Sequence, residues 1–189
     1  MKNIIRAALL LLIALAFHVV PAEAGTYAED KAKAEQYADE LISTREAVSE
    51  ILAGSETAIT EQDFLKTYGK VYGRIVELQK KEGYIITFSA IKARNPQNAA
   101  TPFEARLLAK FKAARDFRKF WTVTMVQDRA YSRLIKPVFA AKSCLVCHGP
   151  REKRPAFIVK RYPADKSSGF KEGELMGLIS IYMPDEEDE

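Results

Sequence analysis

Residues 118–149 read RKFWTVTMVQDRAYSRLIKPVFAAKSCLVCHG, and this stretch decides the fold class. Residues 118–127 and 130–139 are rich in β-branched and aromatic side chains, which favours two strands. The Asp128–Arg129 pair between them predicts the turn of a hairpin. The second strand leads directly to Cys144. The hairpin therefore delivers the chain to its only cysteine pair.

Two helices are expected upstream of this hairpin. Residues 27–52 and 60–81 both carry apolar side chains at helical spacing. The tetrapeptide that begins at Thr60 has the form of a capping box, which marks the start of the second helix. The remaining expected elements are a strand over residues 84–91, a helix over 101–115 and a strand over 175–183. Together they predict an α+β fold with a mainly antiparallel sheet.

The N-terminus has the pattern of a secretory signal peptide. Lys2 and Arg6 precede an almost entirely apolar run of about fourteen residues over 7–20, and small residues at positions 22 and 24 suit cleavage after Ala24. The alternative is a membrane anchor, but the run is shorter than the ~20 residues that a spanning helix needs. We therefore expect residues 1–24 to be removed on export and the mature chain to be periplasmic.

The rest of the chain is expected to form one domain, residues 25–184. It has a helical part over 27–81 and a sheet and cofactor part over 83–184, and an acidic end follows at 185–189. That end is most simply solvated. The net charge of the whole chain is +4, with charges of both signs interspersed. This pattern does not predict a nucleic-acid-binding stripe.

The motif Cys144-Leu-Val-Cys147-His148 predicts covalent attachment of one haem c, with His148 as an axial ligand of the iron. A structural zinc site is disfavoured because it needs four nitrogen or sulfur ligands. After loss of His18 with the signal peptide, only three such side chains remain. A thioredoxin-type site is disfavoured because Gly-Pro follows the motif at once. A plain disulfide leaves His148 unexplained.

The sixth position of the iron stays open in the sequence. Methionine would raise the reduction potential and suit electron transfer, whereas an open position would suit binding of a gas or another small ligand. The candidates are a tyrosine, a lysine, water, or one of Met125, Met176 and Met183. We take Met125 as the candidate sixth ligand, although a methionine in an apolar strand is often core filler.

Several separated motifs resemble the Tll0287-like family. They are SCLVCHG over 143–149, GFKEG over 169–173, GLISI over 177–181, and RNPQN over 94–98 with Phe-Glu shortly after. The resemblance covers the chain from about Leu41 to Pro184. It implies a PAS-like antiparallel sheet with long N-terminal helices around a covalent haem. It also implies a periplasmic sensory or redox role, often as the input module of a signalling protein.

The chain departs from many relatives on the second helix. Where they carry a cysteine, this sequence has the region from Tyr68 to Tyr72, so we do not expect a thiolate at the sixth position. We also expect no membrane helix or kinase-like output to follow the domain, so signalling would need a separate partner.

The predicted haem-binding residues beyond the motif come from two segments. Arg94 suits a haem propionate because a guanidinium matches a carboxylate. Asn95 and Asn98 either donate to the propionates or only form a turn. Tyr68 and Tyr72 either line the distal side of the haem or pack as core aromatics.

Three functions remain open. The function we expect is a sensor of redox state or a sensor or binding protein for NO, CO or another small ligand; in the small-ligand case the iron would be five-coordinate or weakly ligated. A one-electron carrier with a partner protein would have a tightly six-coordinate iron. A haem enzyme would need a distal acid or base in addition to an open iron. The two helices over 27–81 could also pair between subunits.

Overall fold

The computed structural model describes residues 22–114 and 116–185. It divides after Lys33 into two compact units, and the described part of the first is the beginning of a long helix. The second unit begins at Ala34 and contains the sheet and the cysteine motif. Residues 1–21 of the predicted signal peptide lie outside the described residues. No helix in the described part of the chain is long and apolar enough to span a membrane.

Both predicted N-terminal helices are present, as α2 (Ala22–Ala53) and α3 (Glu61–Glu82). The predicted capping box is confirmed: Thr60 Oγ1 accepts a hydrogen bond from the Asp63 N–H at 3.2 Å, and the Asp63 carboxylate accepts one from the Thr60 N–H at 3.0 Å. Gly83 ends the helix with a φ of +68°, a conformation that glycine adopts without strain.

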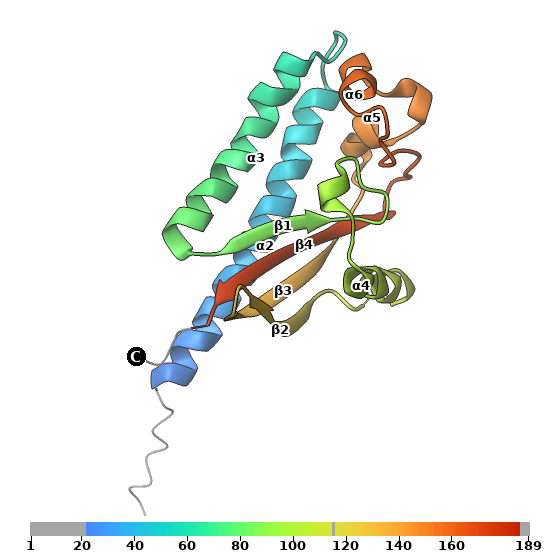
Figure 1. Cartoon of the computed structure of the whole chain (residues 1–189). Helices are drawn as coiled ribbons and strands as arrows, with labels where there is room; N and C mark the ends of the chain where they lie inside the picture. Colours follow the sequence, from blue (N-terminus) through green and yellow to red (C-terminus); the bar gives the residue numbers. More distant parts are fainter. Residues whose placement is uncertain (1–21, 115, 186–189) are drawn as a thin grey trace, which may run out of the picture. The chain divides into compact units, whose positions relative to one another are not determined.

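The sheet has four strands in the order β1 (Ile85–Ser89), β4 (Leu175–Pro184), β3 (Arg129–Phe139) and β2 (Phe120–Val126) (Figure 1). Every neighbouring pair is antiparallel. The α+β class with an antiparallel sheet is thus confirmed.

The turn of the β2–β3 hairpin lies one residue earlier than predicted. Gln127 and Asp128 are its central residues, with φ of +50° and +64°, and Val126 pairs with Arg129. A two-residue hairpin turn of this type requires positive φ at both central positions, because its twist then matches that of the strands.

Helices cover both faces of the sheet (Figure 1). Leu134 of β3 points to the face covered by α2 and α3, where Leu41 and Leu78 pack. The next residue, Ile135, points to the opposite face, where it packs against Phe111 of α4 (Pro102–Ala113). Successive strand residues alternate in this way, so the sheet is the middle layer.

Residues 140–173, between β3 and β4, form an excursion that we call the motif lobe. Its ends meet: the Ala140 N–H donates to Glu174 O at 2.8 Å, and the Gly173 N–H donates to Ala140 O at 2.7 Å. A loop was expected after the motif, but the lobe contains short helices there. Pro155 immediately precedes one of them, where a missing N–H costs nothing. The helical segments of the lobe are η2 (Lys142–Cys144), α5 (Leu145–His148), η3 (Arg151–Lys153) and α6 (Ala156–Arg161).

Candidate haem site

The two cysteines and the histidine of the motif lie on one short helical turn. Cys144 precedes α5, and Cys147 and His148 are its last two residues. Both thiols are free; Cys147 is buried and Cys144 is half-buried. Residues three apart on a helix lie on the same side. Gly149 follows the turn as its C-cap. A larger residue would not fit there, because its Cβ would lie 2.5 Å from Leu145 O.

The His148 ring is held by Ser167. Its Nδ1 lies 2.9 Å from Ser167 O and 2.8 Å from Ser167 Oγ. A carbonyl oxygen only accepts, so we assign the ring proton to Nδ1, which leaves the lone pair on Nε2. Burial, and then the nearby Arg94 guanidinium, lower the pKa of His148 to about 3. The imidazole is therefore neutral near pH 7, as a metal ligand must be.

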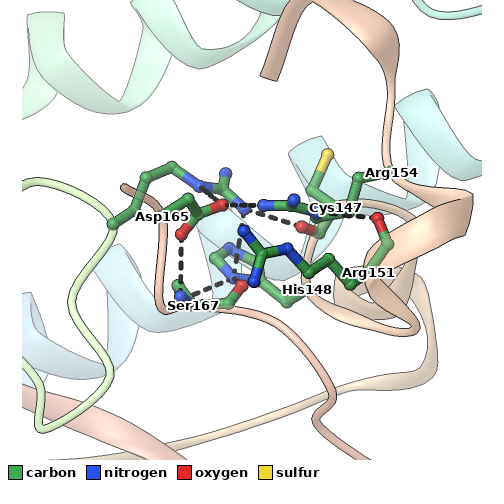
Figure 2. Close-up of polar contacts among 7 residues, drawn as sticks. Cys147, His148, Arg151, Arg154, Asp165 and Ser167 are labelled. Carbon is green, nitrogen blue, oxygen red and sulfur yellow. Dashed lines mark hydrogen bonds and ion pairs between the residues drawn. The ribbon is translucent and has the colours of Figure 1, made fainter. Parts of the chain in front are cut away.

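Asp165 is the centre of the polar network around this histidine (Figure 2). Its Oδ2 accepts hydrogen bonds from Arg94 Nε at 3.1 Å and Arg154 Nη1 at 2.6 Å, and its Oδ1 accepts one from the Ser167 N–H at 2.7 Å. Burial raises the pKa of Asp165, but the Ser167 N–H and the two guanidinium groups outweigh it and hold the pKa below its ordinary value. The carboxylate thus stays charged and positions the residue that holds His148.

Arg94 has a place in this network that the sequence did not predict. Besides Asp165, its Nη2 donates to Cys147 O at 2.6 Å and lies 3.4 Å from His148 Nδ1. With the proton on Nδ1, the last contact is electrostatic and not a hydrogen bond. Arg94 therefore ties its own loop to the motif turn. Its predicted pairing with a haem propionate stays a prediction.

The two asparagines of the same loop have turn-forming roles. Asn95 Oδ1 accepts a hydrogen bond from the Gln97 N–H at 3.1 Å and caps η1 (Pro96–Asn98). Asn98 O accepts one from the Ala90 N–H at 2.9 Å, which joins the loop to the end of β1. These contacts fit the turn alternative. Both asparagines nevertheless line a large cavity beside the motif turn.

A cavity of about 590 Å³ lies beside the motif turn. Its size is within the range of small-molecule and cofactor sites. The predicted site residues that line it are Tyr68, Tyr72, Arg94, Asn95, Asn98, Cys147 and His148. Cys144 lines a smaller pocket that shares five residues with the cavity: Arg45, Tyr68, Val138, His148 and Met176. The fold therefore brings together residues that come from α3, the RNPQN loop and the motif lobe.

Met125, the candidate sixth ligand, is not among the residues that line this cavity. It lies on the edge strand β2, its side chain is 63% exposed, and it pairs with Ala130 beside the hairpin turn. The motif follows the other end of β3, so the strand separates the two. Of the other methionines considered, Met183 is buried in the core and Met176 lines the cavity.

Tyr68 faces the cavity with its hydroxyl already engaged. Its Oη lies 3.1 Å from Ser49 Oγ, and Ser49 donates its proton to Arg45 O at 2.8 Å. Tyr68 must then be the donor to Ser49. Its ring stacks on Phe64 with centroids 4.6 Å apart. Tyr72 also lines the cavity, but it is 65% exposed.

Sequence reasoning missed Asp165, Arg154 and Ser167. A local signal existed for two of them, because an Asp side chain often accepts from the N–H two residues later. The partnership of Asp165 with Arg94, 71 residues away, has no such signal.

Comparisons with known proteins agree on one relationship. The Tll0287-like family model matches residues 23–184. A crystal structure of the cyanobacterial haem protein Tll0287 is 27% identical and aligns with a TM-score of 0.68, covering 85% of this chain and 98% of the other. Comparison with curated proteins gives no significant match. Since the family model spans most of its length, this chain belongs to the Tll0287-like family.

Proposed function

We propose that this chain binds one haem c, attached covalently through Cys144 and Cys147, with His148 as the axial ligand. One observation carries the proposal: two free thiols and an oriented, neutral imidazole share one helical turn beside a cavity of about 590 Å³. The family supports it, because the solved relative is described as a haem protein.

The residues around the motif fit this role. Ser167 fixes the tautomer of His148 by accepting a hydrogen bond from its Nδ1–H. Metal-bound histidines typically donate such a bond from the ring nitrogen that does not bind the metal. Asp165 and Arg94 hold Ser167 and the Cys147 carbonyl. A haem held by these residues would supply one-electron redox chemistry, and it would bind small ligands if its iron had an open position.

We further propose that the protein is exported to the periplasm and uses the haem to sense redox state or a small ligand. Tyr68 and Met176 face the cavity, and neither a second histidine nor a third cysteine is present in residues 25–189. The alternative is a one-electron carrier in which Met176 ligates the iron. Its place in the cavity wall is the observation that favours this alternative.

Covalent attachment is tested by haem staining on a denaturing gel of protein produced with a cytochrome c maturation system. We expect the full chain to retain its haem and the Cys144→Ser/Cys147→Ser double variant to lose it. Haem that stays on the double variant would overturn the attachment site. N-terminal sequencing of protein from a periplasmic fraction tests export, and we expect Gly25 as the first residue.

The use of the iron is tested by the absorption spectrum of the ferrous protein with and without CO. We expect CO to shift the Soret band of the natural protein, as binding at an accessible position requires. A spectrum that CO leaves unchanged in the natural protein, but shifts in Met176→Leu, would establish the carrier alternative. Met125→Leu is the matched control, because its exposed side chain is outside the cavity.

A further inference from the structure

Positive charge is concentrated in the motif lobe. Residues 140–173 contain eight lysines and arginines and three acidic residues, a net charge of +5. Because the whole chain has a net charge of +4, the remainder carries −1. Thirty-four of the 189 residues thus account for the positive charge of the protein.

Most of these cationic side chains are exposed and form no ion pair within the described part of the chain. Arg154 is buried on Asp165, and Arg161 pairs with Glu61 of α3. The other six side chains are exposed, and none forms an ion pair with a residue of the described ranges: Lys142, Arg151, Lys153, Lys160, Lys166 and Lys171. Their charge is available to a partner.

None of these six cations lines the cavity. The basic residues that line the cavity are Arg45, Lys92 and Arg94, and all three lie outside the motif lobe. These are the cations that could pair with the carboxylates of a haem held in the cavity. The six exposed cations belong to the lobe that carries the motif, and two of them flank it in the sequence: Lys142 precedes Cys144 by two residues, and Arg151 follows His148 by three.

We propose that the motif lobe is a docking surface for a partner protein with a carboxylate-rich patch. Complementary charge would steer that partner onto the segment that carries the motif. This docking proposal rests on the proposed function, because its purpose would be to bring a partner protein close to a haem held by the motif. A protein fits better than a bilayer: within the described residues, Val159 is the only large apolar side chain of the lobe that is exposed, and interfacial binding needs an apolar face.

The test uses the haem-loaded full chain and a fluorescent poly-glutamate peptide as probe, with binding followed by anisotropy. We expect binding at about 20 mM salt and at least about tenfold weaker binding at about 300 mM, where the Debye length is short. The variant Lys153→Glu/Lys160→Glu/Lys166→Glu should weaken binding about tenfold. The matched control Lys80→Glu/Lys110→Glu/Lys112→Glu, with the same change in net charge on α3 and α4, should weaken it less than about threefold.

Four results would overturn the proposal. They are no binding of the peptide, equal losses in the two triple variants, tight binding only to vesicles that contain phosphatidylserine, or self-association at low salt that disappears when residues 185–189 are removed. The absorption spectrum of each sample shows whether haem is present. A failure of docking is thereby distinguished from a failure of the proposed haem site.

Discussion

Two buried carboxylates in this protein are paired with arginine, and they do different things. Asp165 is 3% exposed and lies in the motif lobe, while Glu104 is 5% exposed and lies at the start of α4. Asp165 joins Arg94 and Arg154 around the motif turn. Glu104 accepts from the Thr101 N–H at 2.9 Å and pairs with Arg133 of β3.

The difference lies in what each pair holds in place. Glu104 joins a helix to the sheet, and Arg133 extends the link to Ser180 of β4 at 2.8 Å. All three belong to regular elements, so this cluster supports the fold. Asp165 joins irregular segments that no helix or strand would otherwise align, and it positions Ser167 against His148. The same chemistry thus stabilises the fold in one place and orients a functional side chain in the other.

The largest effect is expected from Asp165→Asn. It leaves two arginines without their buried counter-ion, and breaking a buried pair in this way costs about 3–5 kcal/mol. We expect the haem content, measured as the ratio of Soret to protein absorbance, to fall together with the free energy of unfolding in urea. Normal haem content in this variant would contradict the positioning role of Asp165.

Glu104→Gln is the matched change in the other cluster. The amide keeps part of the hydrogen bonding but loses the charge opposite Arg133, so we expect a loss of about 2–3 kcal/mol in the free energy of unfolding. The Soret position and the haem content should stay those of the natural protein. If they shift as in Asp165→Asn, the two clusters are not separable.

The pH dependence of stability gives a third comparison. Burial raises the pKa of Glu104, but the Thr101 N–H and Arg133 outweigh it, so the folded-state pKa lies below its ordinary value of 4.5. Its contribution to stability is therefore complete above about pH 4.5 and is lost as the pH falls through the folded-state pKa. The free energies of unfolding in urea of the natural protein and of Glu104→Gln should therefore approach each other as the pH falls below about 4.5. A constant difference down to pH 3 would contradict the assignment.

Arg94→Lys should have a smaller effect, about 1–2 kcal/mol, because lysine keeps the charge but lacks the planar fork that reaches Asp165 and Cys147 O together. Thermal unfolding monitored by circular dichroism measures the loss. We also expect a broader Soret band, since the motif turn would be held less firmly. An unchanged melting temperature would show that Arg94 acts outside this network.

The smallest effect is expected from Asn95→Ala, which removes only the cap of a short 3-10 turn and costs about 0.5–1 kcal/mol. The reduction potential of the haem should not change. A shifted potential would instead support the other role predicted for Asn95, donation to a propionate.

The elements that depended on local chemistry were predictable. Thr60 and Asp63 form the capping box that their spacing indicates, and Gly83 ends α3 with positive φ, as glycine there suggests. The sequence predicts the hairpin but places its turn one residue late, at Asp128–Arg129, because glutamine seldom adopts the positive φ that Gln127 has here. The sequence does not predict α6, because Pro155 favours a loop, although proline also precedes helices.

Sequence by itself determined the motif, the helix caps, the alternation of the strands and the class of the fold, because each depends on residues within a few positions of one another. Only the tertiary structure decided which methionine faces the cavity, since that follows from the strand order and from the end of β3 at which the motif starts. It also decided that Arg94 is bonded to Asp165, because a buried carboxylate takes its counter-ion from whichever segment the fold brings within reach.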